Sequence, residues 1–332
     1  MNLALFLGVK FLSNDISVND VAWRLLMELC ENASRYNVNV KKAECGATIV
    51  DAGVYAKGGL EAGRIITEIC MGGLGRAELT CREYDGIELP CIHVYTDSPA
   101  ISSLGSQLAG WNVKDGDYSA IGSGPARALA LKPKSLYETI GYRDSSDRAV
   151  LVLETEKEPP ENVLKKVAGE CHVECEKLAV ILTPTSSLAG AVQIAGRIVE
   201  TGLQKLMKVG LDPKKVLSAW GISPIPPSHP KFLYAMARTN DVILYGGISY
   251  FTVEYEDEDE LAKIVERAPS SASKAYGKPF LEIFEEAGKD FYKIDPNIFA
   301  PAVVIVNNVK TGNVFKSGEI NTKPLLQSLG FK

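Results

Sequence analysis

The chain has 332 residues, of which 46% are apolar and 23% are charged, and its formal net charge is −5. This composition excludes an intrinsically disordered chain, and the acidic balance excludes the strong positive field that binds nucleic acid or anionic lipid. No apolar run reaches the roughly 20 residues that a membrane-spanning helix needs. These two observations predict neither a nucleic-acid nor a membrane partner. Seven scattered cysteines form no regular framework, so we expect reduced thiols and a cytoplasmic location.

Predicted helices and strands alternate along the chain. Ser17 can cap the first helix, because Asp20 follows three residues later. Apolar runs bounded by turn residues predict strands over 45–53, 92–95, 149–153, 178–182, 242–245, 249–255 and 302–309. Helical spacing and end signals predict helices over 161–168, about 188–209, from Pro213, and over 280–287.

This alternation predicts an α/β or mixed α+β fold. The length suggests two domains, and the short polar segment 144–147 is the best candidate for their boundary. We therefore predict an N-terminal extension over 1–16, an N-terminal α/β domain over 17–147 and a C-terminal α/β domain over 148–332, and we leave open that strands cross between the two domains.

The predicted helix over 188–209 carries the most informative pattern. At about 100° per residue, its apolar side chains form one stripe centred on Leu188. A separate polar ridge contains Gln193, Arg197, Glu200 and Gln204. Arg197 and Glu200 are three residues apart, so their side chains can touch.

Two interpretations of this ridge remain open from the residues alone. An ordinary solvated helix face would carry a weak surface ion pair. Alternatively, the ridge faces a cleft, where Glu200 transfers protons and Arg197 keeps the carboxylate ionised. Small residues such as Gly190 and Gly196 favour the second interpretation, because they let another element approach closely.

Other segments contain weaker candidates for ligand binding. The turn Gly122-Ser-Gly-Pro-Ala-Arg127 precedes a predicted helix, where free backbone N–H groups can bind an anion, although a helix start without a ligand explains the pattern as well. Two polar segments beside predicted strands can line a pocket or form ordinary turns; they contain Thr96, Asp97, Ser98, Asn240 and Asp241.

Cofactor motifs are missing from the sequence. It has no phosphate-binding loop of the NTPase kind and no dinucleotide-binding fingerprint. The segment Cys171-His172-Val-Glu-Cys175 is the nearest approach to a zinc site. It lacks a second ligand pair, so buried or half-buried thiols are the better explanation and we expect no metal.

Several motifs together resemble a known family. They occur in this order: Ser17-Val-Asn19, Gly46-Ala-Thr-Ile-Val-Asp-Ala-Gly53, Gly58-Gly-Leu-Glu-Ala-Gly-Arg64, Tyr95-Thr-Asp-Ser-Pro-Ala100, Ser106-Gln-Leu-Ala-Gly-Trp111, Gly122-Ser-Gly-Pro-Ala-Arg127, Ala195-Gly-Arg-Ile-Val-Glu200, Ala237-Arg-Thr-Asn-Asp-Val-Ile-Leu-Tyr-Gly-Gly247 and Phe299-Ala-Pro-Ala302. Each motif alone is weak, but the ordered set is similar to the methenyltetrahydromethanopterin cyclohydrolases from about residue 17 to the C-terminus.

The resemblance implies two α/β domains with a pterin pocket between them, assembled as a homotrimer. The implied reaction is the reversible hydrolysis of a cationic 5,10-methenyl bridge to the 5-formyl compound, without a metal or redox cofactor. The family's catalytic arginine and glutamate match Arg197 and Glu200. The substrate also carries a long phosphate-bearing tail, and we expect Ser123, Gly124 and Arg127 to bind it. Further polar contacts are expected from Thr96, Asp97, Ser98, Asn240 and Asp241.

Two other functions compete with this one. A Gly-Ser-Gly turn before a helix also occurs in small-molecule kinases, although the companion Ser-Ser pair and basic helix are missing here. A non-catalytic oligomeric ligand-binding protein would use Arg197 and Glu200 as a surface or intersubunit ion pair.

Overall fold

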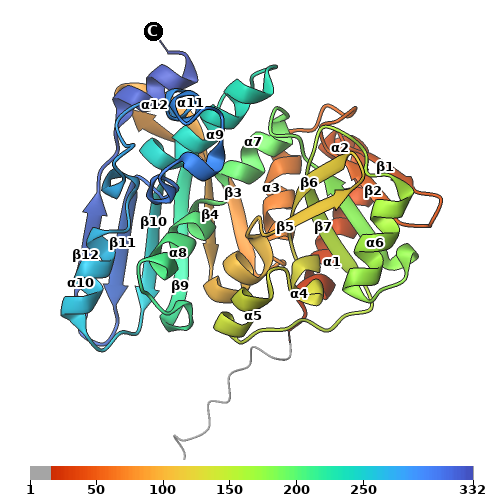
Figure 1. The fold of residues 1–332 in the computed structure, drawn as a ribbon, viewed down its shortest axis with the longest axis horizontal. Coiled ribbons are helices and arrows are strands. Elements are labelled where there is room, and N and C mark those ends of the chain that lie inside the picture. The colour runs from red at the N-terminus through yellow and green to blue at the C-terminus, as the bar shows by residue number, and fades with distance from the viewer. Residues whose placement is uncertain (1–15, 332) are drawn as a thin grey trace, which may run out of the picture.

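Two six-stranded mixed sheets lie side by side in the computed structural model, which describes residues 16–331 (Figure 1). The α/β class predicted from the sequence is therefore confirmed. Of the expected extension over 1–16, residues 1–15 lie outside the described residues. Within the described part, no helix combines the length and apolar character needed to cross a membrane.

The inner strands of the first sheet are buried on both faces. Its strand order is β1 (Asn39–Lys42), β2 (Thr48–Asp51), β8 (Leu178–Leu182), β7 (Ala149–Glu154), β6 (Tyr118–Ser123) and β5 (Trp111–Asp115). The three inner strands β2, β8 and β7 are parallel, whereas the outer strands pair antiparallel. The continuous apolar runs of β7 and β8 are typical of parallel strands that are covered on both sides.

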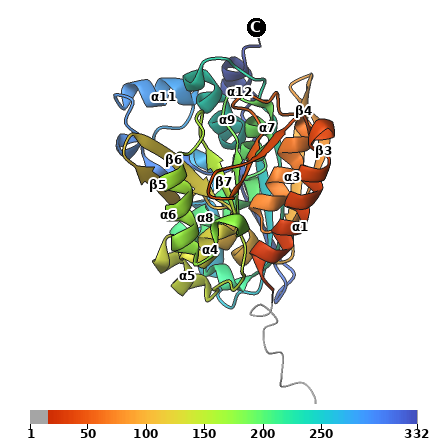
Figure 2. The same cartoon turned by 90° about the vertical axis from the view of Figure 1, so that its right-hand side faces the viewer.

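Helices cover the two faces of this sheet separately. One face packs against α1 (Val18–Glu31) and α3 (Leu60–Cys70), and the other against α4 (Ala126–Ala130) and α6 (Glu161–Cys171), as Figure 2 shows on either side of β7. The predicted cap of the first helix is confirmed, because Ser17 Oγ accepts from the Asp20 N–H at 3.1 Å. The short helices α2 (Ala33–Tyr36) and α5 (Lys134–Ile140) complete this half.

The second sheet has the order β12 (Val314–Gly318), β11 (Val303–Asn308), β10 (Ile248–Val253), β9 (Val216–Pro224), β4 (Ile87–Thr96) and β3 (Gly75–Tyr84). Only its β10–β11 pair is parallel. Strands β11 and β12 pair antiparallel and form a C-terminal hairpin.

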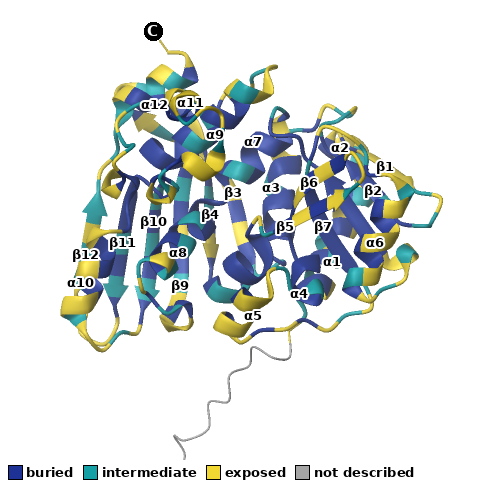
Figure 3. Ribbon diagram, in the orientation of Figure 1, coloured by how far each residue is buried: buried dark blue, intermediate teal, exposed yellow. Residues whose placement is uncertain are grey.

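One face of the second sheet belongs to the largest apolar core. That core also takes in α8 (Ile198–Lys208), α9 (Phe232–Gly246), α10 (Glu258–Glu266), α11 (Phe280–Glu286), α12 (Thr322–Leu329) and a π-helix over Ala100–Gln107. Figure 3 shows the buried interior strands against the exposed outer surfaces of α5, α6 and α10. On the opposite face of the sheet, neighbouring strands carry half-exposed aromatic side chains, among them Tyr95 and Trp220.

Three sequence expectations were wrong. The helix predicted over 188–209 is two helices, α7 (Leu188–Ala195) and α8, and Leu188 is exposed rather than central to a packed stripe. The strand predicted over 242–245 is the end of α9, since a short buried apolar run fits either element. The helix predicted from Pro213 is a single 3-10 turn that leads into β9.

The predicted boundary at residue 147 does not separate the two sheets. Strands β3 and β4 precede it yet belong to the second sheet, and β7 and β8 follow it yet belong to the first. The chain therefore crosses between the halves several times. The crossing between α7 and α8 brings Arg197 to the junction of the two halves.

Candidate active site

The break between α7 and α8 positions Arg197. Gln107 Nε2 donates to the Gly196 carbonyl at 3.1 Å, and this bond takes the carbonyl out of the helical ladder. Gly196 also packs closely on α3, because a Cβ there would lie 2.6 Å from Thr67 Cγ2. Arg197 then becomes the N-cap of α8, with φ −85° and ψ 8°.

The Arg197 side chain is held by three partners from three different segments. Its Nη1 donates to the Gln107 carbonyl at 2.6 Å, and its Nη2 donates to Ser123 Oγ and to Gln193 Oε1, both at 2.9 Å. The side chain is almost fully buried. Hydrogen bonds of this kind to a charged donor fix the guanidinium plane as well as its position. The interpretation of the polar ridge as a solvated face is therefore wrong.

Glu200 lies in the first turn of α8 and is 6% exposed. The spacing in the sequence allowed Arg197 and Glu200 to touch, but within the described residues no hydrogen bond or ion pair joins them. Burial raises the pKa of Glu200 above its usual value, and the positive charges of Arg197, Arg127 and Lys208 oppose this rise without outweighing it. The expectation that Arg197 prevents the pKa from rising is therefore corrected.

A cavity of about 280 Å³ opens beside these two residues. We call it the Glu200 cavity. Its lining includes Arg197 and Glu200 at the start of α8, Ile194 of α7, and Thr239 and Asn240 of α9. Apolar side chains, including Phe299, complete the lining. A partly apolar cavity with a buried carboxyl of raised pKa suits proton transfer to or from a bound ligand.

The predicted anion-binding turn supports Arg197 instead of lining this cavity. Ser123 Oγ accepts from Arg197, and the Gly124 N–H donates to the Ser106 carbonyl at 2.9 Å. Arg127 is fully buried and donates to the carbonyls of Leu104, Ser106 and Lys132. These contacts occupy the Gly124 N–H and the Nε and Nη1 of Arg127, while Arg127 Nη2 is buried without a partner among the described residues.

The first of the two polar segments forms a turn outside the Glu200 cavity. Thr96 Oγ1 donates to the Leu74 carbonyl at 2.7 Å and accepts from the Ser98 N–H and the Ser102 hydroxyl at 3.0 Å each. Asp97 is exposed. None of Thr96, Asp97 and Ser98 lines the cavity.

The second polar segment is divided between the cavity and the core. Asn240 lines the Glu200 cavity, while its amide nitrogen donates to the Met236 carbonyl at 2.9 Å. Asp241 points into the core, where it accepts from the Phe280 N–H at 2.9 Å and from the Ser328 hydroxyl at 2.5 Å. Burial raises the pKa of Asp241 to about 7.

Sequence reasoning gave no role to Gln107 and Phe299. Gln107 both breaks the helix before Arg197 and accepts from its guanidinium, and Phe299 lines the cavity. Both lie within motifs that carry the family resemblance, and that is the only signal in the sequence that marked them. Within residues 16–331, no three His, Cys, Asp or Glu side chains gather as a metal-binding group.

Comparison with known proteins identifies the family. The family model described as "Cyclohydrolase (MCH)" matches residues 17–329. A methenyltetrahydromethanopterin cyclohydrolase from Methanothermobacter marburgensis is 46% identical over 318 residues, which cover 95% of this chain and 99% of the relative. The chain belongs to the methenyltetrahydromethanopterin cyclohydrolase family.

Further relatives agree with this assignment. The proteins of the same name from Methanocaldococcus jannaschii and Methanospirillum hungatei are each 46% identical, over 319 and 316 residues, and each match covers 95% of this chain and 99% of the relative. Coverage of this extent includes both sheets and the Glu200 cavity. The chain is therefore an enzyme of the cyclohydrolase family, and the kinase and non-catalytic alternatives are set aside.

Proposed function

We propose that the protein reversibly hydrolyses 5,10-methenyltetrahydromethanopterin to 5-formyltetrahydromethanopterin in the one-carbon metabolism of methanogenesis. The relatives carry this activity in their names. The observation that best supports the site is the buried Glu200, which lines a cavity together with residues of α7 and α9 and has a raised pKa and no hydrogen-bonding partner among the described residues.

Glu200 handles the proton of the attacking water. The methenyl carbon belongs to a cationic amidinium group, and its positive charge beside the cavity favours the carboxylate form of Glu200. When water adds to that carbon and loses a proton, the substrate loses its positive charge. The pKa of Glu200 then rises, at the step in which Glu200 accepts the proton. The electrostatic change in the substrate therefore drives the transfer in the required direction.

The same carboxyl group completes the reaction. Glu200 passes its proton to N10 as the bond between N10 and the carbon breaks. The remaining hydroxyl proton leaves as the formyl C=O forms, so one proton is released per turnover. Because the steps are reversible, the same proton positions serve the reverse reaction.

Arg197 acts by position and charge. Its three hydrogen bonds hold the guanidinium at the cavity wall, where its charge limits the rise in the pKa of Glu200. Asn240 contributes a polar contact from α9. Ser123, Gly124 and Arg127 serve as positioning residues behind Arg197. The reaction transfers no electrons, so it needs no redox cofactor, and the proton transfer assigned to Glu200 uses no metal.

We also propose a homotrimeric assembly and a cytoplasmic location. A homotrimer is supported by the half-exposed aromatic face of the second sheet, where Trp220 and Tyr250 stack with ring centroids 5.8 Å apart. Apolar faces of this kind commonly form protein interfaces. The scattered cysteines support a cytoplasmic location.

A spectrophotometric assay tests the proposed function. Purified protein is mixed with 5,10-methenyltetrahydromethanopterin, and loss of the methenyl absorption is followed for wild type, Glu200→Gln and the control Glu266→Gln, whose residue is exposed on α10. We expect rapid loss with wild type and the control, and little with Glu200→Gln. Absence of activity in wild type would contradict the proposed substrate.

A further inference from the structure

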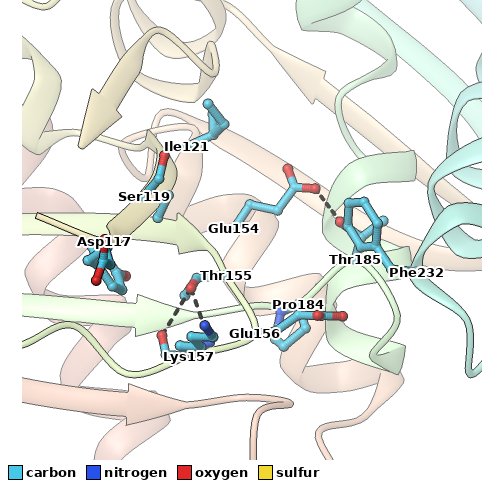
Figure 4. A pocket seen from close by; sticks show the side chains of 12 residues that line it. Asp117, Ser119, Ile121, Glu154, Thr155, Glu156, Lys157, Pro184, Thr185 and Phe232 are labelled. Carbon is cyan, nitrogen blue, oxygen red and sulfur yellow. Dashed lines mark hydrogen bonds between the residues drawn. The ribbon is translucent and has the colours of Figure 1, made fainter. Parts of the chain in front are cut away.

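A second, larger cavity lies at the ends of the parallel strands of the first sheet. Its volume is about 380 Å³. Its lining includes Glu154 at the end of β7, Thr185 after β8, Ser119 and Ile121 of β6, and Phe232 at the start of α9, all labelled in Figure 4. We call it the Phe232 cavity. Crevices at the carboxyl ends of parallel strands are a usual place for ligands in α/β folds.

Three elements connect the Phe232 cavity to the Glu200 cavity. Helix α9 supplies Phe232 to one and Asn240 to the other, eight residues apart, or about 12 Å along a helix. Helix α7 follows Thr185 and ends beside Arg197. Strand β6 runs from Ser119 at the Phe232 cavity to Ser123, which binds Arg197, a span of about 13 Å. An extended ligand of ordinary length can therefore reach both cavities.

The polar lining is rich in hydrogen-bond acceptors and hydroxyl groups. Carboxylates come from Asp117, Glu154 and Glu156, and only Lys157 supplies a positive charge. The Glu154 carboxylate accepts from the Thr185 hydroxyl, as Figure 4 shows. This excess of negative charge disfavours a phosphate or carboxylate group in the cavity. Hydroxyl groups of a ligand, in contrast, can donate to the carboxylates.

Two further features favour a ligand with C–H and O–H surfaces. Phe232 is 47% exposed and Ile121 is 41% exposed, so both present apolar surface to the cavity. Tyr118 forms part of the same wall, and its buried hydroxyl has no hydrogen-bond partner within the described residues. A hydroxyl group of a ligand in the cavity could supply the missing partner.

We infer that the Phe232 cavity binds an uncharged, hydroxyl-rich segment of the substrate's tail, with its reacting ring in the Glu200 cavity. This inference rests on the proposed function. The segment's hydroxyl groups bond to Glu154 and Ser119, and its C–H face packs on Phe232. The phosphate of the tail lies beyond this acidic cavity. These contacts stabilise the bound substrate and the transition state equally, so they lower KM and leave kcat unchanged.

The first test compares two substrates. Wild type and Phe232→Ala are assayed with the complete methenyl substrate and with a methenyl-bridged pterin that lacks the tail. For the complete substrate, we expect Phe232→Ala to raise KM about tenfold and to change kcat less than twofold. For the shortened substrate, wild type should already show the raised KM, and the substitution should have no further effect. Tyr292→Ala, which removes an aromatic ring that is 99% exposed, is the matched control.

A second variant tests the ligand's charge. Glu154→Gln keeps an oxygen that can accept from Thr185 but loses the negative charge. If the ligand is hydroxyl-rich and uncharged, we expect the substitution to raise KM by less than about threefold. For a cationic ligand, KM would rise about tenfold or more.

The possible results separate the inference from the proposed function. Wild type that is inactive on both substrates contradicts the function itself. Two results would overturn the inference and leave the proposed function intact. One is an equal KM of wild type for the two substrates. The other is a Phe232→Ala substitution that changes KM equally for both substrates. A large increase in KM for Glu154→Gln would overturn the inference that the bound segment is uncharged.

Discussion

Replacing Arg127 with methionine separates a supporting role from an anion-binding role. The guanidinium donates to the carbonyls of Lys132, Leu104 and Ser106 at 2.8, 3.2 and 3.1 Å, and it is fully buried. Methionine fills similar space without any donor, so the three carbonyls lose a partner. Each loss costs about 1–3 kcal/mol, although removal of a buried charge, whose pKa is lowered by desolvation, returns part of that cost.

The expected net loss is about 3–5 kcal/mol in the free energy of unfolding. For a protein of this size, that corresponds to a fall of about 6–15 °C in the midpoint of thermal unfolding. The midpoint is measured by circular dichroism, and KM is measured in the methenyl absorption assay at a temperature where the variant stays folded. We expect a large fall in the midpoint with KM changed less than threefold. A stable variant with a strongly raised KM would refute the supporting role and restore the anion-binding one.

Three further substitutions test other parts of the structure. The pKa of Asp241 is raised on folding to about 7, so its contribution to stability is fully present below about pH 4 and is lost as pH rises toward 7. The stability difference between wild type and Asp241→Asn should therefore fall by up to about 4 kcal/mol between these pH values in urea titrations, and a pH-independent difference would contradict the assignment. Gly196→Ala places a methyl group 2.6 Å from Thr67 Cγ2 and should cost about 1–3 kcal/mol of stability and lower kcat, so an unchanged melting midpoint would exclude the close packing. Ser123→Ala removes one partner of Arg197 and should lower kcat up to about tenfold with a shifted pH profile, and an unchanged profile would exclude a positioning role.

The family motifs and the Arg197–Glu200 spacing were enough to predict where the site lies in the chain. Both residues are buried beside one cavity, as the cleft interpretation required. The break at Gly196 could not be predicted, because it depends on Gln107, which is 89 residues away in the sequence. A helix with Gly196 in its interior has the same local pattern as two helices separated by it. The contact that the spacing allowed between Arg197 and Glu200 does not form, because partners far away in the sequence hold the Arg197 side chain.

In both sheets, strands without a continuous apolar run were harder to recognise than strands with one. The continuous apolar runs of β7 and β8 are strong signals. Strand β9, in contrast, places Gly221 against α8, where a Cβ would lie 2.9 Å from Ile198 Cγ2. Its opposite face carries the half-exposed Trp220. The usual alternation of large apolar and polar residues is therefore lost, because close helix packing requires a small residue inside and an aromatic residue lies outside.

The most direct test of the role of Glu200 is a single-turnover experiment with Glu200→Gln. Enzyme in excess is mixed rapidly with the methenyl substrate, so that substrate binding and loss of the methenyl absorption are observed separately. We expect binding within a few-fold of wild type and hydrolysis slowed by a factor of about 10² or more, the usual contribution of general acid–base catalysis. Hydrolysis within a few-fold of the wild-type rate would show that Glu200 does not handle the proton.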